Sequence, residues 1–353
     1  MPISAVDSIT LAIEHTKQQL FKPFRIGQWT RLAFVGLLAG ELGANGCNRS
    51  NFQLHPHPPV VAPHFPSLPA MAPALVAAAI SAIIAGLAIG LIFMYIGSVM
   101  RFILFDSVVA RECHIRWDWS RRLGPGWKYF TWKLLYIVLS LVAAAFMIGI
   151  PTAFAFSAGW FRAPKEHLAP LVLAGAFFFC AFLVFLIATA VIFVLTKDFV
   201  IPQMALEDLD VMAGWRRLWE MIKVEKGAYV VYIVMKIVLA IVVGILMGIA
   251  TLILGLIIAI PSVGLGILAV ISGKTAGLTW NVHTIALAVV IGCALLAIFF
   301  YLVALIYVPA IVFFPAYSIH FFAARYPRLQ AALYAQSPGS APGAPFAGGA
   351  PAS

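Results

Sequence analysis

The sequence predicts an all-helical protein that crosses a membrane several times. Of its 353 residues, 63% are hydrophobic and only 10% are charged, whereas a soluble domain is nearer half apolar and a quarter charged. The apolar residues form runs of about 20 or more, the length that a helix needs to cross a hydrocarbon core. With so few charged residues, the chain cannot cover its apolar surface with polar groups, so we expect that surface to contact lipid. The predicted fold class is a polytopic membrane helical bundle.

Six segments are predicted as spans within a single membrane domain over residues 1–335. They run over 28–46, 74–100, 132–157, 170–196, 228–260 and 283–313. The Gly-rich stretch 262–273 follows Pro261, and we expect a short outer helix or a re-entrant piece there. Residues 336–353 consist mainly of Pro, Ala, Gly and Ser, a composition typical of a disordered tail.

The distribution of basic residues orients these spans. The segments on one side hold 18 Lys and Arg residues, those on the other side hold 4, and Lys236 lies inside a span. Because positively charged loops stay in the cytoplasm, the sequence predicts that both termini are cytoplasmic. The net charge of +10 reflects this placement, so it does not indicate a nucleic-acid partner.

Amphipathic segments are predicted on the inner surface. Residues 3–22 place Val6, Ile9, Ile13 and Leu20 along one side of a helix. Such a helix is expected to lie in the plane of the membrane interface.

The two inner segments 105–123 and 200–218 resemble each other, which indicates either a degenerate internal repeat or chance similarity. In both, we expect a basic amphipathic helix along the inner surface between two spans, and a pair of arginines lies close to tryptophans. These arginines are the candidates for binding anionic lipid headgroups: Arg121, Arg122, Arg216 and Arg217.

Two charged residues fall inside the predicted spans. Glu41 and Lys236 lie at similar depths when each is measured from the inner face. Charges inside a membrane usually have a partner or a role. Three interpretations stay open: a Glu41–Lys236 ion pair, side chains that reach the two interfaces separately, or a part in transport.

Two further patterns carry competing interpretations. Glycines spaced as GxxxG occur at 36/40, 86/90 and 244/248, a spacing that serves packing within the chain or formation of a homo-oligomer. The first outer loop contains His55, His57 and His64. They are weak candidates for a metal site, and the many prolines around them favour an irregular polar loop instead.

Three motifs make the chain resemble a known group of proteins. They are FDSVVARECHIRW at 105–117, DFVIPQMALEDLDVMAGWRRLW at 198–219 and FPAYSIHFFAARYP at 314–327. The chain resembles an uncharacterised multi-pass membrane family of bacteria and archaea, similar to the membrane domain attached to some glycerophosphoryl diester phosphodiesterases. The resemblance implies a helical domain of the bacterial inner membrane. The catalytic domain has no counterpart here, so no catalytic residue is carried over.

No pattern of catalytic residues stands out in the sequence. It contains no evident nucleophile–base set, paired carboxylates, phosphate-binding glycine loop or HExxH pattern. We therefore predict no enzymatic activity and no cofactor. The leading prediction is a protein that organises or senses the inner membrane through anionic lipid. The alternative is a transporter of a small molecule or lipid.

Overall fold

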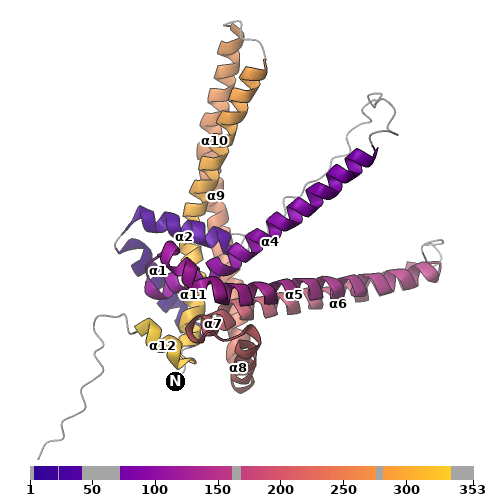
Figure 1. Ribbon diagram of the computed structural model, residues 1–353, viewed down its shortest axis with the longest axis vertical. Coiled ribbons are helices and arrows are strands. Elements are labelled where there is room, and N and C mark those ends of the chain that lie inside the picture. The colour runs from indigo at the N-terminus through magenta and orange to yellow at the C-terminus, as the bar shows by residue number, and fades with distance from the viewer. Residues whose placement is uncertain (1–3, 23, 42–71, 161–167, 276–280, 335–353) are drawn as a thin grey trace, which may run out of the picture.

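The structure is a computed structural model that describes residues 4–22, 24–41, 72–160, 168–275 and 281–334. Within these ranges every regular element is a helix. Long apolar helices diverge from one compact hub (Figure 1). The hub is where segments distant in the sequence come together.

Three arms leave the hub. The first is the single helix α4 (Ala72–Ala110). The second is the hairpin of α5 (Ile115–Ser157) and α6 (Leu168–Leu195). The third is the hairpin of α9 (Lys226–Thr275) and α10 (Val282–Ile306).

The hub combines the inner ends of these arms with shorter elements. These are α1 (Asp7–Phe21), α2 (Ile26–Leu38), the π-helical turn η1 (Thr196–Val200), α7 (Ile201–Glu207), α8 (Val211–Val224), α11 (Val308–Ala323) and α12 (Pro327–Tyr334). Its core is rich in aromatic rings. Phe199 of η1 contacts Tyr232 of α9 and Phe321 of α11, and Tyr232 stacks on Tyr317.

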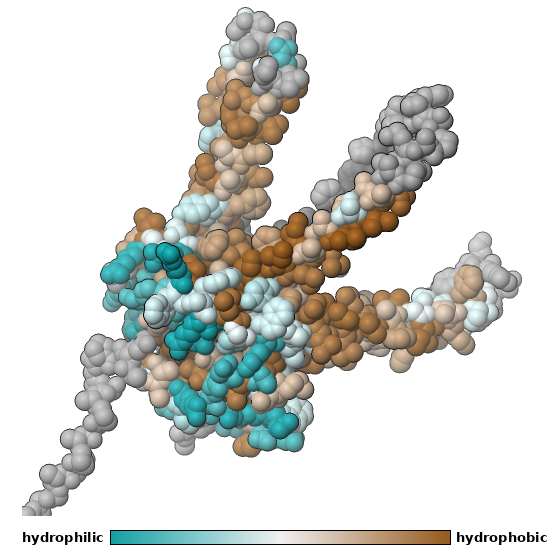
Figure 2. Space-filling view, in the orientation of Figure 1, coloured by the Kyte–Doolittle hydropathy of each residue, from teal (hydrophilic) through white to brown (hydrophobic). Residues whose placement is uncertain are grey.

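The hub and the arms differ in what covers their apolar side chains. Phe199, Tyr232 and Tyr317 are fully buried in the hub, whereas Ile83 and Phe177 on the arms are 67% and 69% exposed. Figure 2 shows the same division, with hydrophilic residues gathered on the hub and hydrophobic ones along the arms. Surface of this kind is stable only in contact with lipid.

The predicted fold class is confirmed. Five described helical stretches are long and apolar enough to cross a membrane: Val76–Ala110, Ile115–Ser157, Leu171–Glu207, Lys226–Gly273 and Thr284–Ala323. They contain or overlap the last five predicted spans. In the predicted span 28–46 the structure shows α2, which has 13 residues. At about 1.5 Å per residue α2 is too short to cross a bilayer, and residues 42–46 lie outside the described residues.

Two expectations about connecting segments were wrong. The stretch 262–273 is neither a separate helix nor re-entrant, because α9 continues through Pro261 to Thr275. The basic segment around Arg121 does not form a separate surface helix, because it is the beginning of α5. The corresponding basic segment around Arg216 does form a separate helix, α8.

The N-terminal helix packs in the opposite sense to that predicted. It buries Ser8, Ala12, His15, Thr16 and Gln19 and leaves Val6 and Ile13 more than half exposed. Small and polar side chains allow α1 to pack against α11. Of the four apolar residues predicted to form one face, Leu20 alone is fully buried.

Candidate functional site

A cluster of five charged side chains lies inside the hub. We call it the ion cluster and define it as Glu41, Arg101, Lys197, Asp198 and Lys236. The side chains of Glu41 and Asp198 are only 2% and 3% exposed. A buried charge without a partner is costly, so the positions of these groups relative to one another decide whether the hub is stable.

A left-handed glycine turn places Glu41. Helix α2 ends at Leu38, and Gly40 has φ of +78°, a conformation that glycine adopts without strain. A Cβ atom on Gly97 of α4 would lie 2.7 Å from the carbonyl oxygen of Leu38. The absence of a side chain at Gly97 therefore lets α4 pass close to the end of α2.

Arg101 lies one turn beyond Gly97 and reaches back to this turn. Its Nη1 atom donates to Oε1 of Glu41, and its Nη2 atom donates to the carbonyl oxygen of Ala39 at 2.6 Å. Hydrogen bonds between charged groups are stronger than those between neutral groups. Arg101 therefore fixes both the carboxylate and the backbone of the turn.

The π-helical turn contributes two oppositely charged neighbours. Lys197 donates to Oε2 of Glu41 at 2.5 Å, while Asp198 accepts hydrogen bonds from Lys236 and from the hydroxyl of Tyr232. Single π-helical turns inside α-helices are rare and frequently mark functional sites. Through η1, the ion cluster joins the end of α2 to α4 and α9.

The Glu41–Lys236 ion pair, one of the three interpretations left open by the sequence, does not form. Glu41 pairs with Arg101 and Lys197, and Lys236 pairs with Asp198. Both predicted residues do belong to the one cluster. The remaining members were missed because their positions, near the ends of apolar runs, suggested that they lie in water.

The ion cluster borders a small cavity of about 20 Å³. Its lining includes Glu41, Arg101, Lys197 and Asp198. The rest of the lining is mainly apolar, with Leu104 and Ile201 among its residues. Such a volume holds about one water-sized species and no larger organic molecule.

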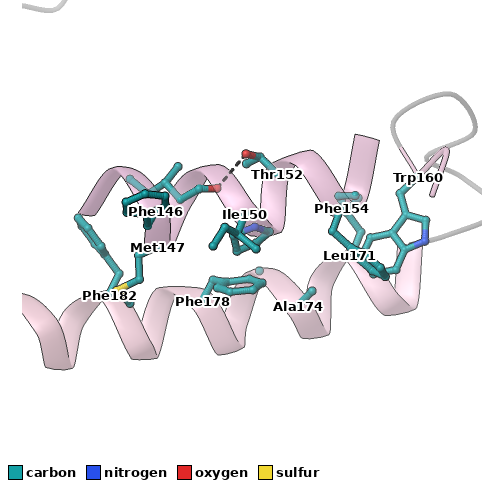
Figure 3. A pocket seen from close by; sticks show the side chains of 14 residues that line it. Phe146, Met147, Ile150, Thr152, Phe154, Trp160, Leu171, Ala174, Phe178 and Phe182 are labelled. Carbon is teal, nitrogen blue, oxygen red and sulfur yellow. Dashed lines mark hydrogen bonds between the residues drawn. The ribbon is translucent and has the colours of Figure 1, made fainter. Parts of the chain in front are cut away.

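A second, larger cavity opens between α5 and α6 near the outer end of their hairpin. It has a volume of about 810 Å³ and is lined by rings and aliphatic side chains, among them Phe146, Phe178 and Trp160 (Figure 3). The Thr152 hydroxyl in its wall donates to the carbonyl oxygen of Ile148 at 2.8 Å. The lining suits an apolar chain.

The four predicted headgroup residues divide into two pairs. Arg121 and Arg216 are exposed, as predicted. Arg122 is buried and forms two hydrogen bonds with Asp106, at 2.6 and 2.7 Å, and a third with the carbonyl oxygen of Ala205. Arg217 binds Glu207 at 2.8 Å. In both inner segments the second arginine therefore reaches back across the turn to an acidic residue of the preceding helix.

Exposed cations and exposed tryptophans lie together at the beginning of α5 and on the exposed side of α8. Arg116, Arg121, Arg216 and Lys223 are exposed, and no ion pair links them to a carboxylate of the described residues. The nearby tryptophans Trp117, Trp127 and Trp219 are 76%, 58% and 53% exposed. We call these seven residues the basic aromatic surface.

Helix α1 is held on the hub by buried polar groups. The Nε2 atom of His15 donates to the carbonyl oxygen of Val108 at 2.9 Å, and Gln19 donates to that of Ser107 at 2.9 Å. The ring of His15 lies edge-on to that of His320, with 5.3 Å between their centroids. Burial, with a smaller effect of the nearby Arg111 charge, lowers the pKa of His15 from 6.5 to about 4.

The three histidines considered for metal binding, His55, His57 and His64, lie outside the described residues together with their loop. Among the residues that the structure does describe, no group of three or more His, Cys, Asp or Glu side chains could hold a metal ion.

A family model matches nearly all of the residues that form the hub and the arms. A model described as a family of unknown function, DUF7544, matches residues 3–332. The chain belongs to the DUF7544 family. No curated protein and no solved structure matches it. The ion cluster and the basic aromatic surface of this DUF7544 protein both fall within the matched region, so the family's sequence pattern extends over the whole candidate site.

Proposed function

We propose that this protein is a non-enzymatic membrane protein that gathers anionic lipids on its hub, in the cytoplasmic leaflet of a bacterial inner membrane. The observation that carries the proposal is the basic aromatic surface. Cations there are free of carboxylates, while neighbouring cations such as Arg122 and Arg217 are engaged in ion pairs. Near an anionic surface each free basic residue contributes about 1 kcal/mol.

The tryptophans strengthen this proposal. Their rings are amphipathic and favour the level of the headgroups. Trp117 follows Arg116 directly, and Trp219 lies three residues after Arg216 and four before Lys223 on α8, so that these side chains share the surface of one helix. The cavity between α5 and α6 further supports contact with lipid, because its apolar lining suits an acyl chain.

Lipid analysis of the purified full chain tests the proposal. The double variant Arg121→Gln/Arg216→Gln removes two unpaired cations. We expect it to retain less phosphatidylglycerol relative to phosphatidylethanolamine than the wild type does in a mild detergent. The matched control is Lys128→Gln/Arg328→Gln, which removes two exposed cations that pair with Asp208, Asp210 and Glu207. Equal losses in both variants would mean that overall charge, and not this surface, determines lipid binding.

Transport is the second candidate function, and one observation favours it. The small cavity reaches Glu41 and three other charged residues, which is the kind of polar interior that a transport pathway requires. Its volume of about 20 Å³ suits an ion better than a lipid. Uptake of a labelled small molecule by vesicles that contain the protein, lost in Glu41→Gln, would favour transport over lipid organisation.

Two finer relationships belong to the proposal. The likeness to the membrane domain of glycerophosphoryl diester phosphodiesterases agrees with a lipid-facing role and brings no catalytic residue to this chain. A homo-oligomer is supported at α4, where a Cβ atom on Gly86 or Gly90 would meet no atom of the described residues within 4 Å, so a second copy could pack against that face. Gly36, in contrast, packs against Ile311 of the same chain.

A further inference from the structure

The ion cluster carries unequal numbers of positive and negative groups. Arg101, Lys197 and Lys236 face only Glu41 and Asp198. The side chains of the three cations are between 9% and 13% exposed. With every group ionised, the ion cluster carries one positive charge in excess. Such a charge calls for a counter-ion or for loss of a proton.

The excess lies on one side of the cluster. Asp198 is matched with Lys236 and also accepts from the hydroxyl of Tyr232. Glu41, in contrast, is shared by two cations, with Arg101 on one oxygen and Lys197 on the other. The uncompensated charge therefore belongs to Arg101 and Lys197.

The small cavity lies beside these two cations. Arg101 and Lys197 line it together with the carboxylates of Glu41 and Asp198, and Lys236 is not among its lining residues. Each carboxylate already accepts hydrogen bonds on the protein, Glu41 from Arg101 and Lys197 and Asp198 from Lys236 and Tyr232. Both lining cations have hydrogen-bond donors to spare: Arg101 uses Nη1 and Nη2 once each, and Lys197 donates once, whereas a guanidinium has five N–H groups and an ammonium has three. The charge and the space that could accept an anion therefore coincide.

We propose that a small monovalent anion, of the size and charge of chloride, occupies this cavity and neutralises the ion cluster. The volume of about 20 Å³ leaves room for one such ion and excludes a lipid phosphate with its glycerol ester. Apolar walls formed by Leu104, Phe105, Ile201 and Ile319 lower the local dielectric, which strengthens the attraction between the ion and the two cations. The inference does not depend on binding of anionic lipid.

Thermal unfolding of the full chain in nanodiscs tests this site. Chloride is compared with gluconate at constant ionic strength, so that screening of surface charges stays the same. Gluconate is too large for the cavity. We expect saturating chloride to raise the Tm of the wild type by about 2–4 °C, the shift that corresponds to a ligand bound well above its Kd. An equal Tm in the two salts would overturn the proposal and favour a neutral Lys197.

Two variants change the excess charge in opposite directions. Lys197→Met leaves two cations against two carboxylates, so we expect the chloride-dependent rise in Tm to disappear. Glu41→Gln leaves three cations against one carboxylate, so lower concentrations of chloride should produce half of the rise. Lys128→Met removes an exposed cation outside the cavity and should respond as the wild type does.

The two variants keep the proposal testable even if one of them fails to fold. A chloride response in Lys197→Met equal to that of the wild type overturns the site. A response of Glu41→Gln that is unchanged or weaker also overturns it. The salt comparison leaves the lipid composition constant, so failure of the lipid proposal would not affect the result.

Discussion

Lys197 and Asp198 are neighbours in the sequence, yet they bind charged groups on different segments. Lys197 contacts Glu41 beyond α2, and Asp198 contacts Lys236 on α9. The π-helical hydrogen bonds of η1 place more residues in a turn than an α-helix does, so adjacent side chains diverge less and both can point into the hub. A sequence pattern based on the α-helical period assigns such neighbours to different faces and does not predict this arrangement.

The first prediction concerns the partner of Lys236. In Lys236→Met, Asp198 loses its counter-charge inside the hub, and removing one partner of a buried pair costs about 3–5 kcal/mol. Adding Asp198→Asn should recover part of that loss in the free energy of unfolding, measured by a double-mutant cycle in nanodiscs. Adding Glu41→Gln instead should recover none of it, because Glu41 pairs with Arg101 and Lys197 and not with Lys236. Equal recovery by both second substitutions would show that the two ion pairs act as one unit.

The second prediction concerns pH and His15. The folded-state pKa is about 4 and the reference value is 6.5. Between pH 6.5 and pH 4, His15 is therefore mostly protonated in the unfolded chain and mostly neutral in the folded chain. The free energy of unfolding should fall as the pH decreases from 6.5 to about 4, by up to about 3 kcal/mol for this one residue.

His15→Gln tests this pH dependence, because the amide can still donate to Val108 and does not titrate. Its Tm should change less with pH over the same range than that of the wild type. His114→Gln, which alters an exposed histidine, serves as the control. His320 and Arg111 face His15 and are present in both variants. A pH dependence in His15→Gln as steep as in the wild type would contradict the assignment.

At the scale of elements, the sequence predicted the long helices well and the short ones less well. Apolar length alone identifies α4, α6, α9 and α10. The orientation of α1 was wrong because hydrophobic periodicity identifies an apolar face and cannot show that a face of Ser, Ala, His and Gln fits more closely against α11. That fit depends on side chains far away in the sequence.

The third prediction concerns the contact between α4 and α5. A Cβ atom on Gly126 would lie 2.6 Å from Cγ2 of Val99 and 3.2 Å from its Cα atom. Gly126→Ala should therefore destabilise the protein by about 1–3 kcal/mol, the usual cost of overpacking. Gly90→Ala on the open face of α4 is the control and should be neutral or slightly stabilising. The Tm of the two variants provides the comparison, and similar values would argue against close packing at Gly126.

At the scale of the whole molecule, composition predicts that the protein lies in a membrane, but it does not predict how the helices are arranged. The apolar fraction requires lipid, and the runs of apolar residues give the helices. The ion cluster depends on how helices meet, so only one intramembrane carboxylate, Glu41, and one cation, Lys236, could be named in advance. Asp198 and Arg101 lie near the ends of apolar runs, where a residue exposed to water looks the same in sequence as one covered by α1, α8 or α11.

The fourth prediction concerns orientation. The uneven division of Lys and Arg residues predicts that the hub lies in the cytoplasm. In a cysteine-free background, Val224→Cys on the exposed end of α8 should be protected from an impermeant thiol reagent added to intact cells. Pro59→Cys, in the first predicted outer loop, should react. The reverse pattern would place the hub on the outer side.

The divergence of the three arms has a consequence for how the protein responds to its membrane. The arms meet at the hub and separate beyond it (Figure 1), so none of the other described elements lies between their outer parts. A thicker or thinner bilayer changes the tilt that each apolar helix adopts. The ion pairs that link α4, η1 and α9 hold the inner ends of the arms together in the hub. We therefore expect a change in bilayer thickness to alter the distances between the arm tips more than the geometry of the hub.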